Sequence, residues 1–145
     1  MAMTMLRHER LLIGVHYAAP PTDDEWERWM QLVRDRDGQQ VRTMVEAHQA
    51  GGPNAKQRRL LEETVRGVDI MTAVLTDSVV TRGIVTAIAW LNISLRAFAP
   101  DQHAAAMTYL GLSEDERAYA MNELPRLRRE CGVPPMKRAS LPRRR

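Results

Sequence analysis

Apolar and polar residues follow one another along this chain in blocks that predict strands separated by helices. Four short blocks are rich in apolar residues and β-formers and end at loop-forming residues, as buried strands do. These predicted strands are residues 11–17, 41–47, 68–75 and 93–98. Between and after them, apolar residues recur every three or four positions, which predicts helices with one apolar face. These predicted helices are residues 23–36, 55–66, 79–91, 102–110 and 114–130.

Residues at the expected helix ends support this division. Thr22 and Ser113 each stand three residues before a glutamate, and this spacing is the capping box that opens a helix. Gly111 follows a predicted helix and can adopt the left-handed conformation that ends one. Pro125 lies inside the last predicted helix, where its ring and its missing N–H favour a kink or a break.

The alternation of strands and helices predicts the fold class. Such an order favours right-handed crossovers and a mainly parallel sheet. We therefore expect an α/β fold with a four-stranded, mainly parallel sheet and flanking helices. The carboxyl ends of the strands then meet at one edge, where open α/β sheets place their ligands. The sequence predicts one domain over residues 1–131, followed by a basic flexible tail over residues 132–145.

Composition excludes several classes of protein. A hydrophobic fraction of 44% is too high for a disordered chain. Cys131 is the one cysteine, so no intrachain disulfide and no cysteine-based zinc cluster can form. No apolar run approaches the roughly 20 residues that cross a bilayer. Residues 1–9 lack the apolar stretch of a secretory signal, so we expect a cytoplasmic protein.

Positive charge is concentrated toward the carboxyl end. Residues 126–145 hold eight basic residues and one acidic residue, a formal charge of +7, whereas residues 1–125 hold 13 and 17, a charge of −4. Such a tail attracts phosphate through salt-sensitive contacts that do not depend on sequence. Ser140 also stands in the Lys-Arg-Ala-Ser-Leu context of a basophilic kinase substrate. We expect weak tail contacts with an acidic partner, nucleic acid or an anionic membrane. The arginines proposed to make them are Arg138, Arg143, Arg144 and Arg145.

The layout of most of the chain resembles that of a known family. A strand ends near Glu46, the next ends in the Thr-Asp-Ser of residues 76–78, and an apolar helix follows. Leu-Arg-Ala-Phe at residues 95–98 then precedes an alanine-rich helix that ends in Leu110. This layout, over residues 11–112, resembles the SpoIIAA-like branch of the STAS superfamily, the fold of anti-sigma-factor antagonists. The resemblance implies a small regulatory module that binds other proteins and lacks catalysis of its own. We also expect the chain to form a homodimer.

The resemblance also implies a partner surface. In the better-known members, an Asp-Ser step opens the helix after a central strand, and phosphorylation of the serine switches partner binding. Asp77 and Ser78 match this step, while residues 79–82 replace the family's Ser-Gly-Leu-Gly. The implied surface, including the turn beside the helix start, comprises Asp77, Ser78, Thr81, Arg82, Gly52 and Pro53.

A competing hypothesis is a small hydrolase. Serine, histidine and aspartate can form a nucleophilic set. The candidates near the expected carboxyl edge are His16, His48, Asp77 and Ser78. The Gly-x-Ser-x-Gly elbow and the glycine-rich phosphate loops are absent. His-x-x-x-His is absent too, so we predict no metal, no cofactor and no small-molecule substrate.

Two tryptophans share a face of the first predicted helix. Trp26 and Trp29 lie three residues apart, which places them on the same side. We expect this side to pack on the sheet. An exposed aromatic pair would instead mark a binding hot spot.

Overall fold

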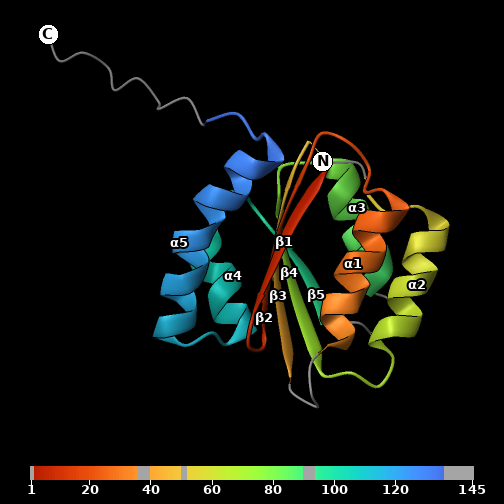
Figure 1. Ribbon diagram of the computed structural model, residues 1–145, viewed down its shortest axis with the longest axis horizontal. Coiled ribbons are helices and arrows are strands. Elements are labelled where there is room, and N and C mark those ends of the chain that lie inside the picture. The colour runs from red at the N-terminus through yellow and green to blue at the C-terminus, as the bar shows by residue number, and fades with distance from the viewer. Residues whose placement is uncertain (1, 36–39, 50–51, 90–93, 136–145) are drawn as a thin grey trace, which may run out of the picture.

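The computed structural model describes residues 2–35, 40–49, 52–89 and 94–135 and has an α/β fold, in which one sheet lies between two layers of helices (Figure 1). Each of the four predicted strands and five predicted helices is present in it. The strands are β1 (Met3–His8), β2 (Leu11–Tyr17), β3 (Val41–His48), β4 (Ile70–Thr76) and β5 (Ser94–Phe98). The helices are α1 (Asp23–Arg34), α2 (Ala55–Val65), α3 (Val79–Ala89), α4 (His103–Leu110) and α5 (Glu114–Cys131).

The sheet has five strands, so the expected number of four is wrong. The additional strand is β1, which pairs antiparallel with β2 from Met3↔His16 to His8↔Leu11. A tight hairpin usually reveals itself by Asn-Gly or Asp-Gly, because its turn needs a positive φ. Here Glu9 adopts that conformation, with φ 52°. The turn therefore has no glycine or asparagine in the sequence to mark it.

Strand order follows chain order, from β1 to β5. Strands β2 to β5 are parallel, so their carboxyl ends meet at one edge, as predicted. We call this the carboxyl edge. Because each crossover steps to the next strand in the same direction, right-handed connections place α1, α2 and α3 on one face. Helices α4 and α5 follow β5 and cover the opposite face (Figure 1).

On the face of α4 and α5, the two-helix face, one cluster of apolar side chains fills the core. Ile13 and Met44 are fully buried there between the sheet and the helices. Leu124 and Leu127 of α5 project onto the strands and are also buried. The same helix contains Pro125, which is exposed, and α5 is continuous from Glu114 to Cys131. The expectation of a break at Pro125 is therefore wrong. The buried leucines on either side of the proline hold the helix against the sheet.

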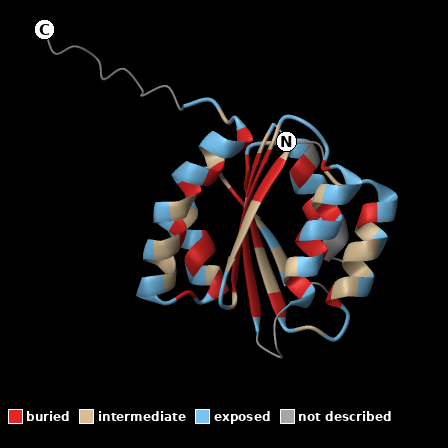
Figure 2. Ribbon diagram, in the orientation of Figure 1, coloured by how far each residue is buried: buried red, intermediate tan, exposed pale blue. Residues whose placement is uncertain are grey.

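On the face of α1, α2 and α3, the three-helix face, the core is divided. Trp26, Trp29 and Met30 of α1 pack with Leu12 and other residues in one cluster. Val74 and Val85 belong to a second cluster beneath α3. Both tryptophans are buried, at 8% and 5% exposure, so the expected packing of this pair on the sheet is confirmed. Figure 2 shows that the buried residues gather on the strands and on the inward sides of the helices.

The predicted capping boxes form. Thr22 Oγ1 accepts a hydrogen bond from Glu25 N at 3.1 Å, and Ser113 Oγ accepts one from Glu116 N at 3.2 Å. Gly111 ends α4 in the left-handed conformation, as expected. In the part of the chain that the structure describes, no helix has both the length and the apolar character needed to cross a membrane.

The predicted tail begins where α5 ends. Gly132 adopts φ 80° there, and Val133 packs against the core of the two-helix face. The chain therefore remains attached to the domain for at least one residue beyond the helix cap. Residues 136–145 lie outside the described residues, and so do the tail positions singled out above: Arg138, Ser140, Arg143, Arg144 and Arg145.

Candidate functional site

The start of α3 lies at the carboxyl edge, directly after β4. Ser78 Oγ accepts a hydrogen bond from Thr81 N at 3.2 Å and so caps the helix. Thr76 Oγ1 accepts one from Ser78 N at 3.1 Å. The Arg82 guanidinium donates through Nη2 to the carbonyl oxygen of Thr76 at 3.3 Å. These bonds give the implied partner segment a defined shape, with Asp77 exposed at its tip.

The other two residues of the implied surface lie elsewhere on this edge. Gly52 and Pro53 follow β3 and precede α2. Together with Thr81 and His16, they line a cavity on the three-helix face, between the strands and the helices that cover them. The structure thus brings Gly52, Pro53 and Thr81 to one cavity, while Asp77 and Arg82 are exposed to solvent.

The sheet separates the two histidines of the hydrolase hypothesis. His16 lies on the three-helix face, where its Nε2 is 2.6 Å from the carbonyl oxygen of Ala19. Burial lowers the pKa of His16. His48 lies on the two-helix face with Glu46, because alternate residues of β3 share a face. Among the described residues, no hydrogen bond joins His48 to Asp77 or Ser78.

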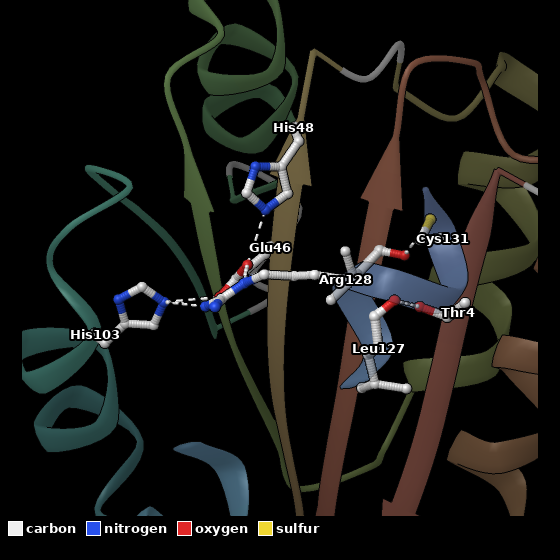
Figure 3. A network of polar contacts seen from close by, with 8 residues as sticks. Thr4, Glu46, His48, His103, Leu127, Arg128 and Cys131 are labelled. Carbon is white, nitrogen blue, oxygen red and sulfur yellow. Dashed lines mark hydrogen bonds and ion pairs between the residues drawn. The ribbon is translucent and has the colours of Figure 1, made fainter. Parts of the chain in front are cut away.

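A buried carboxylate organises the carboxyl edge on the two-helix face (Figure 3). The Glu46 side chain on β3 is only 3% exposed. Its Oε1 accepts hydrogen bonds from His48 Nε2 at 2.8 Å and from Arg128 Nε at 2.7 Å. Its Oε2 accepts from His103 Nε2 at 2.7 Å and from Arg128 Nη2. We call these four residues the Glu46 network; it connects β3 with α4 and α5.

The network fixes the charge of its central carboxylate. Burial by itself raises the pKa of Glu46. The hydrogen bonds from Arg128, His103 and His48 outweigh burial and hold this pKa well below its usual range. The same contact raises the pKa of Arg128. Glu46 and Arg128 therefore form an ion pair, with both carboxylate oxygens bridged by one guanidinium.

His48 and His103, the two histidines of the Glu46 network, have the same tautomer when neutral. Each places Nε2 on Glu46, so in the neutral ring the proton is on Nε2 and Nδ1 is the acceptor. A carboxylate that orients a histidine in this way is also found behind catalytic bases. Within residues 2–35, 40–49, 52–89 and 94–135, no group of three or more histidine, cysteine or acidic residues is placed to hold a metal ion.

Sequence reasoning missed Glu46, His103 and Arg128 as partners. One signal was present: Glu46 is a charged residue between two apolar neighbours, Val45 and Ala47, in a predicted strand. Charged residues are almost never fully buried unless they are paired. A buried partner could therefore be expected, but its identity depends on how α4 and α5 dock.

No family model matches the chain. Among curated proteins, no significant match was found. A functional assignment therefore depends on the sequence and the geometry of this chain alone.

Proposed function

We propose that this protein is a cytoplasmic, non-catalytic, STAS-like regulatory module that binds another protein through the start of α3. The resemblance to the SpoIIAA-like branch is part of this proposal. The observation that carries it is the exposure of Val79, the first residue of α3. Its side chain is 82% exposed, so its apolar surface is available for contact with a partner.

The surroundings of Val79 fit the centre of a small interface. Asp77 and Arg82 flank it, and both are exposed. An apolar residue within a polar, charged rim is the usual arrangement of a protein–protein contact. The hydrogen bonds of Ser78 and Thr76 hold the segment in one conformation, so binding would not need to order it.

Ser78 is the position at which such a contact would be switched. Its hydroxyl is half-buried and already caps α3. A phosphate there would bring about two negative charges beside Val79 and the helix start. The positive end of the helix dipole favours that charge, while an apolar contact at Val79 would be disrupted by it. Phosphorylation of Ser78 is therefore proposed to release the partner.

The chain offers a matched control for the test. Two large apolar residues are exposed among those whose side chains the structure describes, Val79 and Met121, the latter at 44%. Met121 lies on α5, which covers the opposite face of the sheet. The experiment compares wild type, Val79→Asp and Met121→Asp as tagged full-length chains in native extracts, with each variant's fold checked by circular dichroism.

The proposal expects one protein to co-purify with wild type and Met121→Asp and to be lost with Val79→Asp. Analytical ultracentrifugation of the purified chain tests whether the partner is a second copy. In that case wild type sediments as a dimer and Val79→Asp as a monomer. Equal recovery with all three chains, or recovery of no protein and a monomeric wild type, would contradict the proposal.

The hydrolase alternative has less support from the geometry. Its two histidines lie on opposite faces, and His48 is bonded to Glu46 instead of to Ser78. The discriminating measurement is ester hydrolysis by wild type and His48→Ala. Turnover that disappears in the variant, while folding is retained, would favour the enzyme.

The tail remains a third proposal, as a weak electrostatic adaptor. It predicts that a chain ending at Pro135 loses binding to RNA or to anionic vesicles at low salt. Unchanged binding by the shortened chain would assign any such affinity to the folded domain.

A further inference from the structure

A cavity of about 120 Å³ lies on the three-helix face, between the strands and the helices that cover them. Protein cores rarely contain voids larger than a water molecule, so a space of this size is unusual. It occurs where the core of this face is divided between the cluster under α1 and the cluster under α3. The apolar side chains that form its wall include Trp26, Trp29, Val45, Leu61, Val74 and Val85.

A polar atom faces this apolar wall without a partner. Thr43 lines the cavity from β3 and is only 2% exposed. Its Oγ1 is buried and has no hydrogen bond, and it is the one such side-chain atom among the described residues. A buried hydroxyl is nearly always bonded, so one left unsatisfied calls for an explanation. Thr72, its cross-strand neighbour on β4, also lines the cavity.

Among the lining residues that the structure describes there is no carboxylate, lysine or arginine. His16 is the one titratable residue in it, and burial disfavours its charged form. An ion would lose its hydration here and find no opposite charge. The cavity therefore suits a neutral molecule. Its size is close to that of an engineered cavity of about 150 Å³ that binds benzene.

We propose that this cavity is a binding site for a small neutral molecule with a single ring and one hydroxyl group. The ring would pack among Trp26, Trp29 and Val74, and the hydroxyl would exchange a hydrogen bond with Thr43 Oγ1. A hydroxyl both donates and accepts, so either direction satisfies the threonine. Val79 is not among the lining residues, and the inference does not depend on the proposed partner.

Phenol, toluene and benzoate test the site directly. Phenol has the ring and the hydroxyl, toluene has a ring of similar size without the hydroxyl, and benzoate carries a charge. Isothermal titration calorimetry with the full-length chain should show phenol binding one to one, toluene binding more weakly, and benzoate not binding. Quenching or enhancement of tryptophan fluorescence should follow the same order, since Trp26 and Trp29 line the cavity.

Two pairs of variants locate the binding. Thr43→Val should weaken phenol about fivefold, the worth of one neutral hydrogen bond, and leave toluene unchanged. Thr4→Val is the matched control, because Thr4 is also a buried strand threonine but bonds Leu127 on the two-helix face. It should leave both affinities unchanged. Val74→Phe places a ring in the cavity and should abolish both, with circular dichroism confirming that it folds.

The remaining outcomes decide against the site or against the role of the Thr43 hydroxyl. No binding of phenol or toluene by wild type up to their solubility limits overturns the proposal. Binding that survives in a folded Val74→Phe places the ligand elsewhere. An equal loss of phenol in Thr43→Val and Thr4→Val shows a general effect on stability and removes the role of the Thr43 hydroxyl. Should Val74→Phe fail to fold, Val85→Phe provides the same test from α3.

Discussion

Two buried polar residues of β3, one on each face of the sheet, differ in their hydrogen bonding. On the two-helix face, Glu46 is buried and both of its oxygens are bonded, by groups from β3, α4 and α5. On the three-helix face, Thr43 is buried on the same strand and its hydroxyl has no partner. The first face is filled by leucines of α5, whereas the second encloses a cavity.

This difference separates structural from binding roles. A fully bonded polar network joins the elements that carry its members and specifies one arrangement of them. An unfilled space with an unpaired hydroxyl adds nothing to stability, and it leaves groups available to a ligand. We therefore expect substitutions on the two faces to change the unfolding free energy by different amounts. For a matched pair of alanine substitutions, we expect changes of opposite sign.

The largest effect is expected from Glu46→Gln. The amide cannot accept from Arg128 and both histidines as the carboxylate does, so the Arg128 charge loses its pair. Breaking a buried ion pair costs about 3 kcal/mol or more of unfolding free energy. Urea denaturation measures this loss. Glu116→Gln is the control: Arg10 bridges its two oxygens at 2.8 Å, but its carboxylate is more exposed than that of Glu46, 15% against 3%. Its loss should cost about 1 kcal/mol or less.

A pair of alanine substitutions tests the packing of the two faces. Ala73 on β4 is fully buried against α4, and Ala47 on β3 borders the cavity. Ala73→Val overpacks a filled core and should lower the unfolding free energy by about 1–3 kcal/mol. Ala47→Val adds methyl groups to empty space and should raise it by about 1 kcal/mol. Thermal denaturation of both variants gives the sign; two changes of the same sign would remove the contrast between the faces.

The pH dependence of stability should also divide between the faces. Burial lowers the pKa of His16 from 6.5, so the unfolded chain takes up a proton there first, and stability falls as pH decreases below about 6.5. The pKa of Glu46 is held below its usual 4.5, so its contribution is complete above that pH and is lost on further acidification.

Two variants separate these contributions in denaturation curves recorded from pH 8 to pH 3. His16→Gln can retain a bond to Ala19 and should remove the part of the decline that begins near pH 6.5. Glu46→Gln should remove the part that begins near pH 4.5. Residual loss below that pH is expected in both, since the Arg10 contact lowers the pKa of Glu116 to about 2.

The smallest effect is expected from the two threonines. Thr4→Val removes a 3.1 Å hydrogen bond to the carbonyl oxygen of Leu127 and should cost about 1 kcal/mol or slightly more. Thr43→Val removes a hydroxyl that bonds nothing, and should leave stability unchanged or raise it by less than about 1 kcal/mol. A cost at Thr43 as large as that at Thr4 would indicate that its hydroxyl is bonded in solution.

Local patterns were sufficient to predict most of the fold but little of the site. Capping boxes at Thr22 and Ser113 and the apolar periodicity depend on residues close in sequence, and the elements they indicate are present. The Glu46 network joins residues 57 and 82 positions apart, so it depends on how α4 and α5 dock. The sequence groups His16, at the end of one predicted strand, with His48, just beyond the next. The face of the sheet that each occupies depends on strand register, which the sequence does not reveal.

The order of the strands bears on how this chain can fold as it leaves the ribosome. Each new strand pairs with the one synthesised before it, so the sheet can grow in the direction of translation. Helix α5 is the exception, since Leu127 bonds Thr4, 123 residues earlier. The nascent sheet therefore exposes apolar side chains of its two-helix face until α5 emerges. A chaperone would be most needed during that interval.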